Sequence, residues 1–104
     1  MFDQFNQNDF ANQLHTVFRL GGGDSGGMEL ELDQVSAVHS YPRQEVFSLV
    51  FKGPGDRLLA QQIYRLEHAQ LGPVDIFLVP IQNDGAAAYY EAVFNRLIPV
   101  DRQV

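Results

Sequence analysis

The chain has 104 residues, 45% of them hydrophobic and 19% charged, a composition typical of one globular domain. Its 13 acidic and 7 basic residues give a net charge of −6, and the basic residues are scattered, so we expect no binding to nucleic acid or to an anionic membrane surface. The chain holds no cysteine, which excludes disulfides and thiolate-bound metals.

The first predicted element is a short helix over Asn8–His15, with Phe10 and Leu14 on one face. Three residues are suitable N-caps for it: Asn6, Asn8 and Asp9. The N-terminal residues show neither the basic segment nor the apolar run of a signal peptide. β-Branched and aromatic residues then predict a first strand, "HTVFRL", over 15–20.

The glycine-rich segment 21–27 contains "GDSGG", the motif around the nucleophilic serine of chymotrypsin-like proteases. Such a serine needs a histidine to take its proton and an acid to orient that histidine. Only His15 precedes Ser25, in an unrelated context, and no helix or lysine follows that would make the glycines a phosphate cradle. We therefore interpret 21–27 as a loop between two strands.

Period-two alternation marks the next strands. Met28, Leu30 and Leu32 alternate with acidic residues, and this strand is predicted to continue past a bulge near Gln34 to Val38. The turn "YPRQ" separates it from a strand over Glu45–Phe51, which ends at the glycine- and proline-rich turn "KGPGDR".

Two further strands follow, over Gln62–His68 and Val74–Pro80. The first alternates, and the second is apolar on both faces, with Phe77 and Val79 opposite its core-facing residues. A strand with two apolar faces needs cover on both. We expect the core on one side, and the N-terminal helix or another subunit on the other.

The segment 86–97 fits two structures. Apolar residues at helical spacing, followed by Pro99, indicate a helix, whereas an Asn-Asp-Gly turn and aromatic content favour a strand paired with Val74–Pro80. We choose the strand. The chain is then a single domain over 1–104, mainly β, with about six strands in a small antiparallel β-barrel or roll and one short N-terminal helix.

No catalytic, cofactor-binding or metal-binding set emerges from the spacing. The histidines, His15, His39 and His68, lie 24 and 29 residues apart, and an acidic ridge (Glu29, Glu31 and Asp33) fits a solvated strand face better than a calcium loop. Glu67 and Glu91 are considered as an acid–base pair, although surface placement is the simpler interpretation. The residues that we nominate as contacts for a ligand or a partner are Glu67, His68, Tyr89, Tyr90 and Glu91.

Five short motifs resemble those of an uncharacterised bacterial family, a domain of unknown function. The motifs are Phe51 with Gly53 and Pro54, Tyr64 with Leu66 and His68, Leu71 with Gly72, Phe77–Pro80, and Tyr90–Asn95. The resemblance covers about half of the chain, weakly includes "NQLHTVFRL", and omits the glycine loop. Members of that family tend to be encoded beside phage-tail-collar-type proteins, which implies a role in a tail-like fibre or in its assembly.

Two hypotheses follow. The first is a non-enzymatic interaction module that binds a partner protein or itself, without a cofactor; it is cytoplasmic or part of an assembled extracellular particle. The second is a small-barrel ligand-binding protein or enzyme that takes an apolar small molecule into the barrel mouth beside Glu67, His68 or Glu91. A filled barrel interior would count against the second hypothesis.

Overall fold

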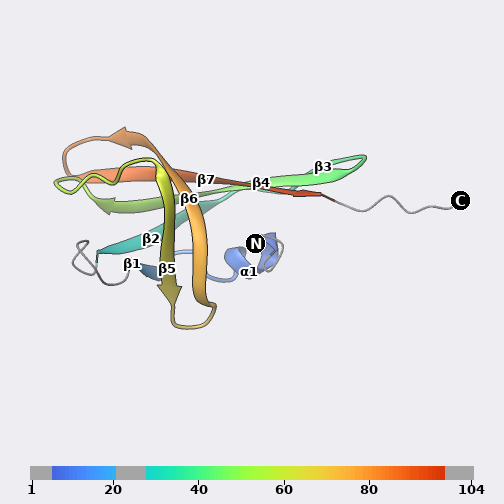
Figure 1. Ribbon diagram of the computed structural model, residues 1–104, viewed down its shortest axis with the longest axis horizontal. Helices are drawn as coiled ribbons and strands as arrows, with labels where there is room; N and C mark the ends of the chain where they lie inside the picture. Colours follow the sequence, from blue (N-terminus) through green and yellow to red (C-terminus); the bar gives the residue numbers. More distant parts are fainter. Residues whose placement is uncertain (1–5, 21–27, 98–104) are drawn as a thin grey trace, which may run out of the picture.

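The computed structural model describes residues 6–20 and 28–97, which form one helix and seven antiparallel strands. The elements are α1 (Gln7–Ala11), β1 (Val17–Leu20), β2 (Glu29–Val35), β3 (His39–Tyr41), β4 (Gln44–Pro54), β5 (Gln62–His68), β6 (Gly72–Asn83) and β7 (Ala87–Leu97). The strand order is β2-β1-β5-β6-β7-β4-β3, and a further pairing of β2 with β4 closes six strands into a barrel (Figure 1). The predicted fold class is confirmed. Within the described residues, no helix is both long and apolar enough to cross a membrane.

Alternating side chains fill the barrel interior. Each barrel strand turns every second residue inward, so that one continuous hydrophobic core forms. Its fully buried members include Phe18, Phe51, Leu66, Ile76 and Leu78. Because large side chains from all six barrel strands meet there, the core occupies the space that a ligand would need.

Closure of the barrel depends on a bulge in β2. The β2–β4 register runs through Glu31↔Lys52 and Leu32↔Phe51, then shifts by one residue before Gln34↔Val50. The extra residue, Asp33, lies close to the bulge predicted near Gln34. Bulges increase local twist and bend the strand, which allows β2 to follow β4 around the barrel.

The segment 86–97 is a strand, as predicted. Ala87–Leu97 pairs with β4 along its whole length, from Pro54↔Ala87 to Gln44↔Leu97, and also forms a hairpin with β6. The turn between β6 and β7 is held by Asp84, whose carboxylate accepts hydrogen bonds from the Ala86 and Ala87 amides. Pairing on both sides outweighs the helical spacing of the apolar residues.

The N-terminal helix is shorter than predicted. It ends at Ala11 instead of continuing to His15, and Asn6 caps it by accepting a hydrogen bond from the Asp9 amide. The helix stops because the His15 amide donates to the carbonyl of Leu32 at 2.7 Å and so joins the sheet. Leu14 is consequently exposed and does not share a buried face with Phe10.

The helix closes one end of the barrel with Phe10. This fully buried ring lies 5.2 Å from the ring of Phe94, 6.2 Å from Phe47 and 6.5 Å from Phe18, centroid to centroid. Of the two covers expected for the outer face of β6, the N-terminal helix is therefore wrong, because its apolar side chain points into the core; another subunit stays a prediction.

A strand that the sequence analysis missed, β3, pairs only with β4. It lies beside the ends of β4 and β7 that project beyond the barrel (Figure 1). All three β3 residues are exposed. With only three residues and no buried side chain, β3 lacks the alternation that identified the other strands.

Two tyrosines hold the loop between β4 and β5. The Tyr90 hydroxyl accepts a hydrogen bond from the Leu59 amide at 3.0 Å, and the Tyr64 hydroxyl donates to the Ala60 carbonyl at 2.6 Å. Burial raises the pKa of Tyr64, since the phenolate would lose hydration. Gly55 in the same loop meets the β6–β7 turn so closely that a Cβ there would lie 2.5 Å from the Gly85 carbonyl oxygen.

Replacing Phe10 tests the role of the helix. We expect Phe10→Ala to lower the free energy of unfolding by about 3–5 kcal/mol, because a fully buried ring leaves a cavity. Leu14→Ala, which alters an exposed side chain three residues beyond the helix, should change it by less than about 1 kcal/mol. Urea unfolding followed by circular dichroism measures both, and equal losses in the two variants would contradict a plug role for Phe10.

Candidate functional site

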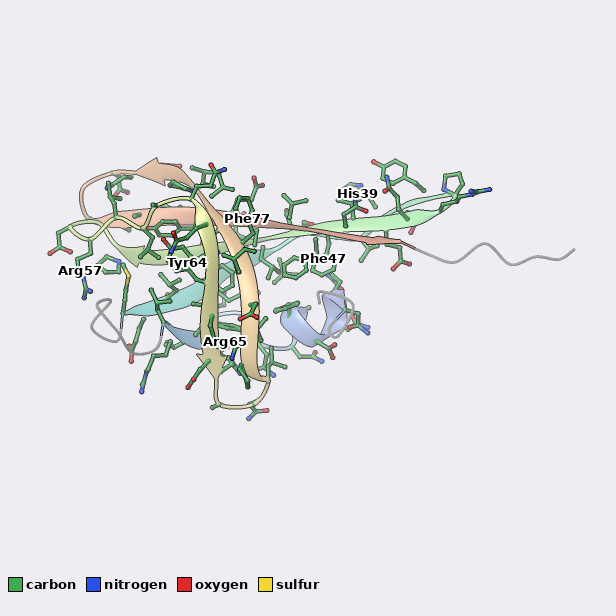
Figure 2. The ribbon with its side chains drawn as sticks, viewed as in Figure 1. His39, Phe47, Arg57, Tyr64, Arg65 and Phe77 are labelled. Carbon is green, nitrogen blue, oxygen red and sulfur yellow. The ribbon has the colours of Figure 1, made fainter. Side chains whose placement is uncertain are left out.

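The outer surface of β5 and β6 carries an exposed apolar pair. Ile63 and Phe77 are direct partners in the β5–β6 ladder, and their side chains are 61% and 41% exposed. The next outward pair along this ladder is Arg65 and Asp75, joined by two hydrogen bonds of 2.8 and 3.1 Å. Figure 2 labels Arg65 and Phe77 on these two strands. The guanidinium lowers the pKa of Asp75, and the carboxylate raises that of Arg65. An ion pair therefore borders the apolar pair.

The apolar surface continues onto β7. Val79 on β6 pairs with Glu91, and Val93 is the next outward residue of β7, with a 59% exposed side chain. We call Ile63, Phe77, Val79 and Val93 the outer apolar face. Exposed apolar side chains with a charged border are typical of surfaces that bind other proteins.

The β6–β7 ladder ends at Val79↔Glu91, while β7 continues along β4 as far as Leu97. The two strands therefore separate beyond this pair, and Val93 lies past the point of separation.

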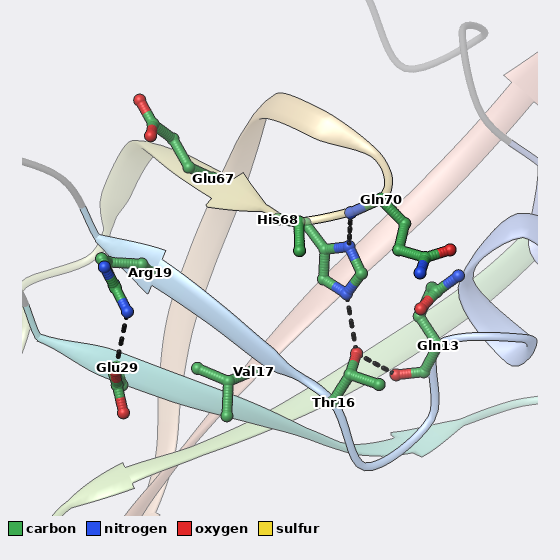
Figure 3. Close-up of a pocket in the computed structure, with 9 residues that line it drawn as sticks. Gln13, Thr16, Val17, Arg19, Glu29, Glu67, His68 and Gln70 are labelled. Atoms are coloured by element: carbon green, nitrogen blue, oxygen red, sulfur yellow. Dashed lines mark hydrogen bonds and ion pairs between the residues drawn. The ribbon is translucent and has the colours of Figure 1, made fainter.

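A second feature is a cleft of about 590 Å³ between β1 and the end of β5 (Figure 3). It forms where the two strands separate beyond the pair Arg19↔Glu67. Mostly polar residues line it: Gln13, Thr16, Val17, Arg19, Glu29, Glu67, His68, Ala69 and Gln70. Arg19 donates to the Glu29 carboxylate at 3.1 Å across its rim.

His68 is the only buried polar or charged side chain among the described residues, with 7% exposure, and both ring nitrogens have partners. Nδ1 accepts hydrogen bonds from the amides of Gln70 and Leu71 at 3.0 and 3.2 Å, so the proton of the neutral ring lies on Nε2. Nε2 donates to the Thr16 hydroxyl at 2.8 Å, which donates to the Gln13 carbonyl. These bonds join the β5–β6 turn to the α1–β1 connection (Figure 3).

The same bonds define what His68 can do chemically. Its Nδ1 lone pair is already shared by two amides, and its Nε2 proton is donated to Thr16, so the ring has no nitrogen aimed at a substrate. Burial lowers the pKa of His68, because the charged imidazolium would lose hydration. The geometry is that of a structural histidine.

The residues nominated from the sequence do not form one site. Glu67 is exposed and lines the cleft beside His68, whereas Glu91 faces outward on β7, on the far side of β6. Tyr90 is fully buried, and Tyr89 is partly buried on the outer surface. The structure thus brings Glu67 and His68 together and separates them from the β7 residues. Ser25 lies outside the described residues.

Another cluster escaped the sequence analysis because its members are distant in the chain. The Nδ1 atom of His15 lies 3.1 Å from a carboxylate oxygen of Glu31, and ligand atoms of His15, Glu31 and Asp33 all lie within 4.8 Å of one another. His15 was considered only with the other histidines, and Glu31 and Asp33 only with Glu29. Only the β1–β2 register unites them.

The His68 bonds predict a pH-dependent stability. The pKa of His68 is lowered in the folded state, so the unfolded chain binds more protons as pH falls below the ordinary pKa of about 6.5. The contribution of His68 to the free energy of unfolding should be fully present above that pH. It should fall as pH decreases from about 6.5 towards the lowered value.

His68→Gln tests this. At about pH 7.5 the variant should lose about 1–3 kcal/mol, because the glutamine oxygen lies one bond further from the backbone than Nδ1 and does not take its place as the acceptor for the Gln70 and Leu71 amides. Its stability should also change less between about pH 7.5 and 5.5 than that of the parent. His39→Gln, which replaces an exposed histidine, should show the same change in stability between these two pH values as the parent, measured by urea unfolding. If stability changes equally with pH in the parent and in His68→Gln, His68 is not the source of the pH dependence.

Comparison with known proteins gives one match. The model of a family described as a domain of unknown function (DUF6916) matches residues 5–94. This agrees with the expected uncharacterised domain family, and the matched range includes α1 and all but the end of β7. No curated protein and no solved structure matches the chain.

Proposed function

The chain belongs to the family described as a domain of unknown function (DUF6916), and we propose that it is a non-enzymatic interaction module. Its role would be that of an accessory or assembly partner in a phage-tail-like fibre system. The motif resemblance described above supports the fibre context. The exposed row of Ile63, Phe77 and Val93 supports the interaction role.

Physical arguments favour the outside of the barrel as the working surface. The interior is occupied by the core cluster, and the one buried histidine is engaged by neighbouring groups. By contrast, exposing Phe77 to water carries a hydrophobic cost that a partner would remove, at about 25 cal/mol for each Å² covered. The outer apolar face is the strongest candidate interface.

The occupant that we propose is another protein, whose apolar side chains would cover Phe77 and Val93. A second copy of the chain is a weaker candidate, because two molecules that each carry a net charge of −6 repel one another.

Co-expression tests the proposal. The full chain and a phage-tail-collar-type protein, of the kind that the resemblance implies as a neighbour, should elute together from size-exclusion chromatography with light scattering. Phe77→Ser should weaken the complex at least about tenfold, since buried aromatic side chains dominate interface energies. Val17→Ser is the matched control: Val17 is 46% exposed but lies on β1, opposite β7 in the barrel order, and should leave the complex intact.

Three outcomes would contradict the proposal: no complex with the neighbouring protein, equal weakening by both substitutions, or a homodimer that Phe77→Ser dissociates. The last outcome would keep the outer apolar face as an interface but assign it to a second copy.

The alternative function is ligand binding in the cleft beside Glu67 and His68. It is supported by the volume of about 590 Å³ and by the convergence of these two nominated residues. Most of the lining residues are of polar types, but the surface that they expose is more apolar than polar, which is compatible with the apolar molecule expected from the sequence. A ligand screen observed by NMR should move the side-chain amide signals of Gln13 and Gln70 in the parent and not in Arg19→Ala. If no compound moves those signals, this alternative fails.

A further inference from the structure

We propose that His15, Glu31 and Asp33 form a binding site for one divalent transition-metal cation, with Zn²⁺ as its probe. This site is independent of the outer apolar face. It lies on the outer surface of the β1–β2 pair, and its three residues come from two segments that the sheet register brings together.

The register explains the convergence. Val17 pairs with Glu31, and the amides of Leu32 and His15 bond to the carbonyls of Thr16 and Leu32, which continues the ladder past the start of β1. His15 and Thr16 thus both bond to Leu32, the residue between Glu31 and Asp33, and this brings the His15 side chain to these two carboxylates. Glu31 and Asp33 are two residues apart and both face away from the core, so all three side chains share one surface.

Two local departures from regular strand geometry occur in this cluster. His15 has a φ of 69°, the one positive value for a residue other than glycine in the described chain, and Asp33 is the extra residue of the β2 bulge. A left-handed residue and a bulge each redirect a side chain relative to a regular strand. Here both redirected side chains carry a metal-ligating group.

The spacing and chemistry suit a metal ion. In a tetrahedral zinc site with bonds of about 2.1 Å, neighbouring ligand atoms lie about 3.4 Å apart. The 3.1 Å between His15 Nδ1 and Glu31 Oε2 is close to this, and small rotations of Asp33 would complete the set. One imidazole and two carboxylates fit zinc and similar cations better than calcium, which prefers oxygen ligands alone. Water would fill the fourth position, since His15 and Glu31 are 63% and 39% exposed.

The surrounding charges also favour a cation, although not uniformly. Two carboxylates close together repel each other, and a bound divalent ion would relieve that repulsion. Glu29, the next outward residue of β2, is paired with Arg19. Lys52 stands opposite Glu31 across the β2–β4 ladder and opposes cation binding. We therefore expect Lys52→Gln to strengthen the binding of zinc.

Isothermal titration calorimetry of the full chain with ZnCl₂ tests the site. At about pH 7.5, where the imidazole must be neutral to bind, one Zn²⁺ should bind per chain. His15→Asn and Asp33→Asn should each weaken binding at least about tenfold, which is about 1.4 kcal/mol. Asparagine tolerates the left-handed backbone at position 15, so His15→Asn removes the imidazole without straining the turn. Unchanged thermal unfolding without metal should verify this.

Two matched controls localise the site. Glu29→Gln alters a carboxylate on the same strand face, and His39→Gln alters an exposed histidine on β3; both should bind Zn²⁺ like the parent. The proposal is overturned if the parent does not bind Zn²⁺ below about 1 mM, or if His15→Asn binds it equally well. It is also overturned if Ca²⁺ competes at equal concentration, because the site would then be a carboxylate pair without a role for the imidazole.

Discussion

Pairing between β2 and β4 is the constraint on which this molecule depends. Without it, the strands would form an open sheet with the inward side chains of its two ends facing water. With it, Leu32 and Phe51 become neighbours on one seam, and every inward row meets the others in a common core. The bulge at Asp33 gives β2 the bend that this closure needs. The fold is thus secured by a contact between residues about twenty positions apart in the chain.

Closure also determines where function is available. Large side chains fill the interior, and Phe10 covers one end, so polar groups inside serve the structure. His68 joins two connections at one end of the barrel, and Tyr64 and Tyr90 hold the loop between β4 and β5. What remains for binding is the outside: an apolar face, a cleft and a cluster of ligating side chains.

The sequence predicts the strands well and their meeting points poorly. Period-two alternation located β5 at its observed bounds, Gln62–His68, and the Asn-Asp-Gly turn identified β7 as a strand. Alternation failed for β3, which buries nothing, and helical spacing overextended α1 because a bond from His15 to the sheet ended the helix. The sequence shows that the outer side of Val74–Pro80 is apolar. Whether the helix covers that side depends on the direction of Phe10, which points into the core instead. The cluster around His15 depends on register, which local patterns do not encode.

Residue-resolved amide hydrogen exchange tests barrel closure most directly. The Leu32 amide donates to the carbonyl of Thr16, the residue before β1, so by strand alternation the Glu31 amide points the other way, towards β4. If the barrel is closed, both amides should exchange only through global unfolding and show equal protection. If Glu31 exchanges orders of magnitude faster than Leu32, β2 has an open edge and the closed-barrel account is contradicted.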